Sequence, residues 1–127
     1  MNPEKVIFGF FIVLSLTTNF GFFVGDISNP DYHDEWQLFV TLVVNAIATV
    51  LKFGDRSHLG ATLLATSLAA MIQLAAAAIV WAIALHGTGV GLTPMVTVSI
   101  VSLSGGAMIA NVISVVLLII ETMMQRR

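Results

Sequence analysis

Four long apolar stretches, joined by short connections, constrain the fold of this chain more than any other feature of its sequence. They cover about residues 6–24, 36–53, 59–86 and 94–124. A helix of about 20 apolar residues crosses the roughly 30 Å hydrocarbon core of a bilayer. The stretches therefore predict an all-α, polytopic membrane protein with four transmembrane helices. We expect the whole chain, residues 1–127, to form a single transmembrane domain.

Composition supports this prediction and excludes several other classes of protein. The chain is 57% hydrophobic and 9% charged, whereas soluble domains carry about 25% charged residues. Its mean hydropathy is +0.98. A soluble chain of this length could not bury so much apolar surface, so we expect the lipid bilayer to surround it. The chain has no cysteine, which excludes disulfides and thiolate metal sites. Its net charge of −2 argues against nucleic-acid binding.

The distribution of charge predicts the orientation of the chain. The first connection lacks Lys and Arg and carries the acidic residues Asp26, Asp31, Asp34 and Glu35. All basic residues fall at the termini or around the second connection: Lys5, Lys52, Arg56, Arg126 and Arg127. Because basic residues favour the cytoplasmic side, four spans place both termini in the cytoplasm and the acidic loop outside. The first stretch is expected to stay as an anchor, since no small-residue cleavage site follows it cleanly.

A polar stripe runs along the second stretch. Thr41, Asn45, Thr49 and Lys52 follow one another at helical spacing, and the opposite face is apolar. Polar groups at bilayer depth are costly unless they are paired or wetted, so the stripe should face inward. One interpretation is that it lines a water-filled path. The other is that it forms interhelical hydrogen bonds, worth about 0.6 kcal/mol each. Lys52 lies near the cytoplasmic end, where its ammonium can also snorkel to water.

Three further amide residues lie within the predicted spans. They are Asn19, Gln73 and Asn111. An amide offers both a donor and an acceptor, so any two of these residues, or one of them and Asn45, can pair across helices.

A row of small residues in the fourth stretch predicts close helix packing. Ser102, Gly106 and Ala110 recur every four residues, which is typical of helix-association surfaces. The run from Ser104 to Gly106 also weakens a helix. Its alternative meaning is a broken helix, of the kind that forms ion sites in transporters.

The acidic loop admits several interpretations. It is a solvated surface loop, a divalent-cation site that includes His33, or an outer mouth that concentrates cations. Its spacing matches no metal-ligand motif, so we predict no metal site and no cofactor. The chain also lacks the sequence motifs of common hydrolases, nucleotide-binding enzymes and haem proteins, and we do not expect an enzyme.

Three segments resemble a known group of proteins. Residues 1–9 (MNPEKVIFG), 44–56 (VNAIATVLKFGDR) and 61–67 (ATLLATS) are similar to small four-helix bacterial inner-membrane proteins of a domain-of-unknown-function family. The resemblance implies size and location in the bacterial inner membrane. It transfers no activity and no site residues.

Two functions fit these observations. The first is a homo-oligomeric channel or channel-like transporter for inorganic ions, with cations favoured. In such a channel, Thr41, Asn45 and Thr49 would line a path around a symmetry axis between identical subunits. Four helices with short loops leave little room for a path within one subunit. A ring of Lys52 side chains would instead favour anions. The alternative is a non-catalytic accessory or scaffold subunit of a larger membrane complex.

Overall fold

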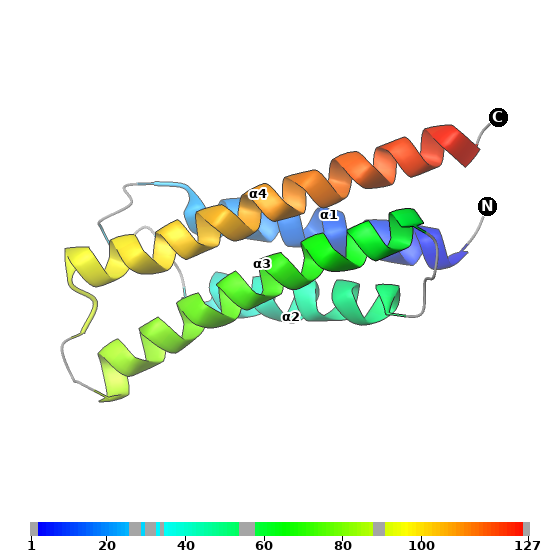
Figure 1. Cartoon of the computed structure of the whole chain (residues 1–127). Helices are drawn as coiled ribbons and strands as arrows, with labels where there is room; N and C mark the ends of the chain where they lie inside the picture. Colours follow the sequence, from blue (N-terminus) through cyan, green and yellow to red (C-terminus); the bar gives the residue numbers. More distant parts are fainter. Residues whose placement is uncertain are drawn as a thin grey trace.

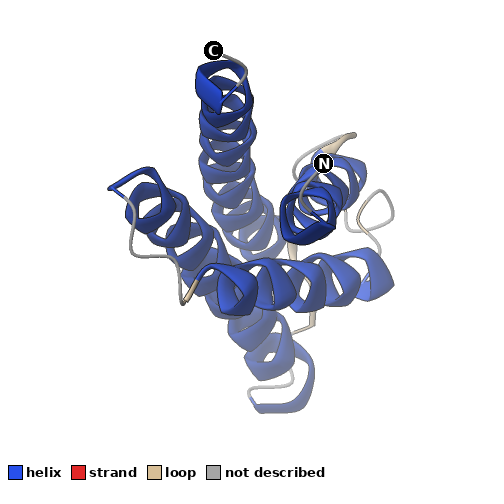
Figure 2. Ribbon diagram, turned by 90° about the vertical axis from the view of Figure 1, so that its right-hand side faces the viewer, coloured by secondary structure: helices blue, strands red, loops and turns tan. Residues whose placement is uncertain are grey.

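The computed structural model describes residues 3–25, 29, 33, 35–53, 58–87 and 91–125. These residues form four α-helices and one π-helical turn: α1 (Pro3–Phe23), α2 (Glu35–Lys52), α3 (His58–Ala82), η2 (Ile83–Gly87) and α4 (Pro94–Gln125). The helices pack as a ring, in which α1 and α3 each contact both α2 and α4 (Figure 1). They cross at clear angles rather than running parallel, as the view in Figure 2 shows.

Local chemistry explains where several helices begin and end. The backbone N–H of Val96 donates to the Thr93 hydroxyl at 3.2 Å, so Thr93 caps the start of α4. Pro94 suits the first helical position because it lacks the N–H that would be unpaired there. Gly25 follows α1 with a φ of 109°, a conformation that glycine adopts without strain. The acid Glu35 begins α2 and the base Lys52 ends it, as the helix dipole favours.

The bundle has the inside-out polarity of a membrane protein. Its outward faces carry large apolar side chains such as Phe10, Val50 and Ile72, which are 60%, 67% and 64% exposed. Its interior contains polar side chains such as Asn45 and Asn111, which are fully buried. Each of the four helices is long and apolar enough to cross a membrane. Four such helices indicate a multi-pass membrane protein.

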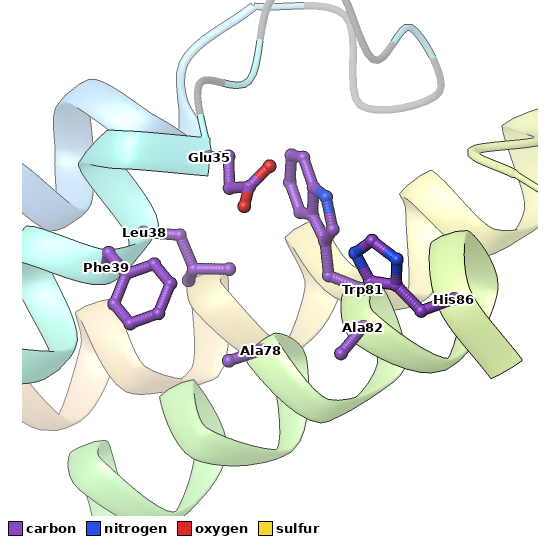
Figure 3. Close-up of a pocket in the computed structure, with 7 residues that line it drawn as sticks. All are labelled: Glu35, Leu38, Phe39, Ala78, Trp81, Ala82 and His86. Carbon is purple, nitrogen blue, oxygen red and sulfur yellow. The ribbon is translucent and has the colours of Figure 1, made fainter.

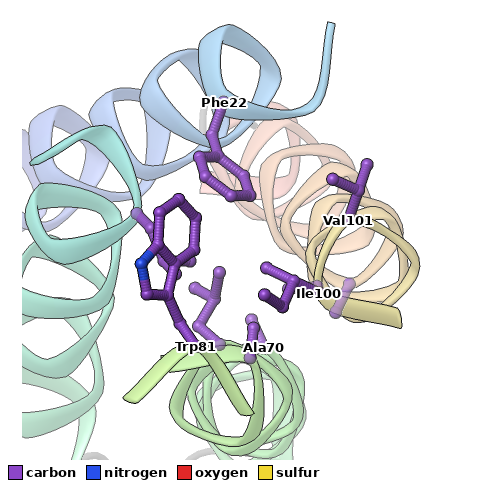
Figure 4. Packing of buried hydrophobic residues seen from close by; sticks show 10 residues of the cluster. Phe22, Ala70, Trp81, Ile100 and Val101 are labelled. Carbon is purple, nitrogen blue, oxygen red and sulfur yellow. The ribbon is translucent and has the colours of Figure 1, made fainter. Parts of the chain in front are cut away.

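An apolar cluster closes the interior toward the end of the bundle where α1 ends and α2 begins. Phe22, Trp81 and Ile100 converge there from α1, α3 and α4 (Figure 4). The Phe22 and Trp81 rings lie 6.1 Å apart between centroids. A smaller apolar cluster at the opposite end contains Phe8, Ile12, Ala48 and Leu63. The buried polar side chains therefore lie alongside these two apolar clusters, the first of which reaches the middle of the bundle at Ala70 and Ala110.

The four predicted stretches coincide with the four helices to within a few residues. α1 begins and α4 ends at the same end of the bundle (Figure 1). The third and fourth stretches are longer than a bilayer requires. The structure accommodates this excess by tilt, by the overhang of α3 and α4 beyond the other two helices, and by η2 at the end of α3.

The fourth helix is continuous through Ser104, Gly105 and Gly106. The alternative of a broken helix at this run is therefore wrong. Its two glycines instead allow close contacts with neighbouring side chains, because a β-carbon at Gly105 would lie 2.8 Å from the Phe23 ring and one at Gly106 would collide with the Gln73 amide.

Candidate functional site in the bundle interior

The polar stripe of α2 faces the interior of the bundle of a single chain. Thr41 and Asn45 are fully buried, Thr49 is 1% exposed and Lys52 is 6% exposed. The opposite face of α2 carries exposed apolar side chains, among them Val43 and Val50. A path lined by this stripe would therefore run within one subunit and not at an axis between subunits. The reason is that α1 and α3 both pack against α2, and they cover its polar face.

The donors of the stripe are used on the backbone of its own helix. The Thr41 hydroxyl donates to the Gln37 carbonyl at 2.7 Å, and the Thr49 hydroxyl donates to the Asn45 carbonyl at 2.8 Å. The Asn45 amide nitrogen donates to the Thr41 carbonyl at 3.2 Å. This back-bonding to the preceding turn is a common arrangement of polar side chains within helices. It uses the hydroxyl protons of Thr41 and Thr49 and one of the two Asn45 N–H groups, and it leaves the Asn45 Oδ1 without a partner among the described residues.

Several buried oxygens have no hydrogen-bond partner among the described residues. They belong to Asn45 (Oδ1), Ser67 (Oγ), Gln73 (Oε1) and Asn111 (Oδ1). Asn45, Ser67 and Asn111 are each 0% exposed. A buried polar atom left without a partner costs about 1–3 kcal/mol. In native proteins such groups are usually satisfied by water, an ion or a ligand, so these oxygens mark the part of the interior that can bind one.

Asn19 is paired with α4. With its amide nitrogen turned toward Ser104, Asn19 donates to the Ser104 hydroxyl at 2.8 Å and to the Ser104 carbonyl at 3.0 Å. Its amide oxygen then accepts from the backbone N–H of Met108 at 3.1 Å. Because this orientation satisfies every group, we assign it. The Asn19 amide therefore bridges one turn of α4 and acts as an interhelical hydrogen bond, whereas Asn45 and Asn111 keep a free oxygen.

The small-residue row of α4 is divided between two surfaces. Gly106 lies against the Gln73 amide of α3, and Ala110 is 9% exposed, so both pack within the chain. Ser102 is exposed. Further along α4, the Ser114 hydroxyl lies 2.6 Å from the Thr66 hydroxyl of α3. The close approach of α3 and α4 thus takes place inside one bundle.

Two buried charged residues, Lys52 and Glu121, lie near the end of the bundle where α2 and α4 end. The Lys52 ammonium lies 4.4 Å from the centroid of the Phe8 ring, a cation–π contact. Glu121 is 6% exposed and lies one turn beyond Leu118, which contacts Gly9 of α1. This end of the polar interior is therefore lined by an aromatic ring and by groups of both charges.

A cavity of about 220 Å³ opens where α2 begins. Figure 3 shows the Glu35 carboxylate and the His86 imidazole on either side of the Trp81 indole. Glu35 is the one member of the predicted acidic mouth that lies among the described residues; Asp26, Asp31 and Asp34 lie outside them. The Trp81 ring separates this cavity from the polar interior, and its indole N–H has no partner among the described residues.

His33 has a structural position. Its side chain is 3% exposed, and its Nδ1 lies 2.6 Å from the Phe22 carbonyl oxygen. Since a carbonyl only accepts, Nδ1 carries the proton and donates. The ring also lies against Phe22, with 5.5 Å between the ring centroids. Within the described part of the chain, no three His, Asp or Glu side chains converge as metal ligands.

Sequence reasoning missed two fully buried hydroxyls, those of Ser15 and Ser67. Ser15 precedes Asn19 by one helical turn, so the same spacing that revealed the stripe of α2 would have placed both on one face of α1. Ser67 lacked such a signal, because neighbouring hydroxyl residues point elsewhere on α3 and Ser67 stands alone on its face.

The sequence was compared with family models, curated proteins and solved structures. The model of a family of unknown function, DUF6394, matches residues 32–122. The chain belongs to this family. The match spans α2 to α4 and confirms the resemblance to a domain-of-unknown-function family. No curated protein and no solved structure matches the chain.

Proposed function

We propose that this DUF6394 protein is a non-enzymatic transport protein that conducts a small inorganic cation through the polar interior of its own four-helix bundle. The observation that carries the proposal is the burial of oxygen acceptors between lipid-facing apolar surfaces. Polar groups inside the membrane are costly, and those that face the interior of a bundle are candidates for lining a substrate or ion path. Because the hydroxyl protons of Thr41 and Thr49 are bonded to their own helix and the Asn45 Oδ1 has no partner among the described residues, oxygen acceptors are available in the interior. Rings of oxygen atoms replace the hydration shell of a cation.

The test is ion flux in liposomes that contain the purified protein. We expect selective flux of a small monovalent cation above that of protein-free liposomes, and none of chloride. Chloride flux without cation flux would contradict the proposal, and it would support the anion pathway that a lysine in the path favours.

Lys52 and Glu35 support a direction for such a path. The Glu35 carboxylate at the end with the cavity attracts cations, whereas the other end carries both the Lys52 ammonium and the Glu121 carboxylate and attracts them less. The apolar layer around Phe22 and Trp81 lies between Glu35 and the stripe, so a path must open there by movement of side chains. A slow, gated transporter fits this interior better than an open pore.

We propose the bacterial inner membrane as the location, with both termini in the cytoplasm. The basic residues favour this orientation, and the helices support it because α1 begins where α4 ends. The chain contains no cysteine, so single cysteines report the side of the membrane directly. Ser28→Cys in the acidic connection should react with an impermeant maleimide added to spheroplasts. The matched variant Ser57→Cys should react only after the membrane is permeabilised, and the opposite result would reverse the orientation.

The alternative function, an accessory or scaffold subunit, is favoured by one observation. Ser99 and Ser102 lie on one face of α4, are exposed, and stand among lipid-facing apolar side chains. Small polar residues on an outward face are typical of contacts with another helix. We propose that this face binds either a second copy of the chain or a different membrane protein.

The mass of the complex in mild detergent separates these cases. A complex that contains only this chain, as a monomer or as several copies, would fit a transporter whose path lies within one bundle. Constant co-purification with one other protein would support the accessory subunit. Whichever chain is bound, Ser102→Leu should reduce the associated mass. If the mass is unchanged in this variant, the assigned face is wrong.

A further inference from the structure

Unpartnered oxygens from three helices lie at one level of the bundle, and the register of α1 against α2 sets the first part of this layer. Two contacts join these helices: Gly21 lies against Gln37, and Phe8 lies beside Lys52. Ser15 is midway between the two contacts on α1, and Asn45 is midway between them on α2. Antiparallel neighbours that are joined at both ends keep their midpoints together, so Ser15 and Asn45 lie at the same depth.

The register of α4 against α1 places Asn111 in the same layer. Two contacts join α4 to α1: Ser104 bonds to Asn19, and Leu118 lies against Gly9. Asn111 is the residue midway between Ser104 and Leu118. The Thr66 hydroxyl of α3 lies 2.6 Å from the Ser114 hydroxyl, one turn from Asn111, and Ser67 follows Thr66. Asn45, Ser67 and Asn111 therefore approach one level from α2, α3 and α4.

The chemistry of this level is that of an acceptor site. The Asn45, Ser67 and Asn111 side chains are each 0% exposed and have an oxygen without a partner among the described residues. The Ser15 hydroxyl at the same depth donates to the Phe11 carbonyl at 2.9 Å, so it too turns a lone pair inward. Oxygen atoms of amides and hydroxyls are the ligands that hard cations prefer.

The charge of the ligand follows from the absence of acids at this depth. The acidic residues of the four helices lie near helix ends: Glu4, Glu35 and Glu121. Divalent cations are held in proteins mainly by carboxylates, whereas neutral oxygens suffice for a monovalent ion. A site formed by amide and hydroxyl oxygens alone is therefore selective for a single positive charge.

We propose that the Asn45, Ser67 and Asn111 oxygens form a binding site for a dehydrated monovalent metal cation at the centre of the bundle. The inference rests on the proposed cation pathway and identifies the ion-binding site in the middle of that pathway. The site binds the ion by replacing its water shell with protein oxygens, as buried oxygen rings do in channels and transporters.

The test is ion-dependent thermal stability of the purified full-length chain in mild detergent. A ligand that binds only the folded state raises the melting temperature in a saturable way. We expect NaCl, KCl or LiCl to raise it by roughly 5 °C over N-methyl-D-glucamine chloride at equal ionic strength. Asn45→Ser and Asn111→Ser shorten a ligand without adding bulk, and each should remove most of the increment. The control Thr122→Ala, at an exposed hydroxyl of α4, should retain it.

Two results would overturn the site. One is equal melting temperatures in all four salts, which means that water alone satisfies the oxygens. The other is an increment that survives in both serine variants, which places the ion elsewhere. Flux in liposomes distinguishes this inference from the proposed function. Cation-specific stabilisation without flux would support the binding site and contradict the transport function. Flux without stabilisation would support the transport function and contradict the binding site.

Discussion

Asn45→Leu should reduce selective cation flux by about ten- to a hundredfold while leaving the fold intact. Asn45 is fully buried at the middle of the stripe, and its Oδ1 has no partner among the described residues. A hydrogen bond or contact to a charged group is worth about 1.5–3 kcal/mol, which corresponds to this range of rates. Leucine has nearly the same shape as asparagine but offers the ion no oxygen.

The stability of the Asn45→Leu variant is expected to be close to that of the native chain. The bond from the Asn45 amide to the Thr41 carbonyl is lost, but that carbonyl also belongs to the hydrogen-bond ladder of the helix. Replacing a buried polar group by an apolar one of similar volume is often neutral. Val43→Leu, on the exposed face of α2, is the matched control and should keep native flux. Unchanged selective flux in Asn45→Leu would remove this residue from the path.

Lys52→Gln should raise cation flux, by up to about tenfold. Lys52 ends the stripe, seven residues after Asn45, which is roughly 10 Å along a helix. An isolated unit positive charge at that distance opposes a cation by about 1.7 kcal/mol at an effective dielectric constant of about 20. This value is an upper limit, because the oppositely charged Glu121 is buried at the same end of the bundle. The expected effect is therefore at most about a factor of ten. Glutamine retains most of the length of the side chain but, being neutral, loses the cation–π contact with Phe8.

Lys52→Arg is the control for charge, and it should keep flux at the native level because the positive charge remains. Initial rates of cation uptake into liposomes, at matched protein content, measure the difference between the variants. Lower cation flux in Lys52→Gln would show that the ammonium supports the path instead of opposing it. A loss of anion flux in this variant would favour the anion pathway.

The sequence shows where the buried charged residues lie along their helices, but it does not show that they are buried. Lys52 was placed at the cytoplasmic end by its position in the stretch, but its burial and its contact with Phe8 depend on α1. Glu121 lies near the end of its stretch and reads as a surface residue, yet it is 6% exposed. The position of a residue within an apolar stretch shows how far along the span it lies. That position carries no information on whether another helix covers the residue.

The small residues of α4 show the same difference. The spacing of Ser102, Gly106 and Ala110 predicts a surface for close packing, and Gly106 does pack closely, against Gln73 of the same chain. Association between chains and association within a chain use the same small residues, because both need only that two backbones approach. Periodicity therefore could not decide between them, and the position of Ser102 on the exposed face could not be read from its place in the row.

The four apolar helices, their approximate ends and the polar stripe of α2 can be predicted from the sequence alone. These are local properties: the length of an apolar run sets a span, and spacing along the chain sets a helical face. What each face contacts depends on the tertiary structure. In the fold, the stripe of Thr41, Asn45 and Thr49 faces the interior of one chain, and Asn19 is paired with Ser104. The physical reason is that helical periodicity relates residues on one helix, while the partner of a face depends on the register and crossing of helices far apart in the sequence.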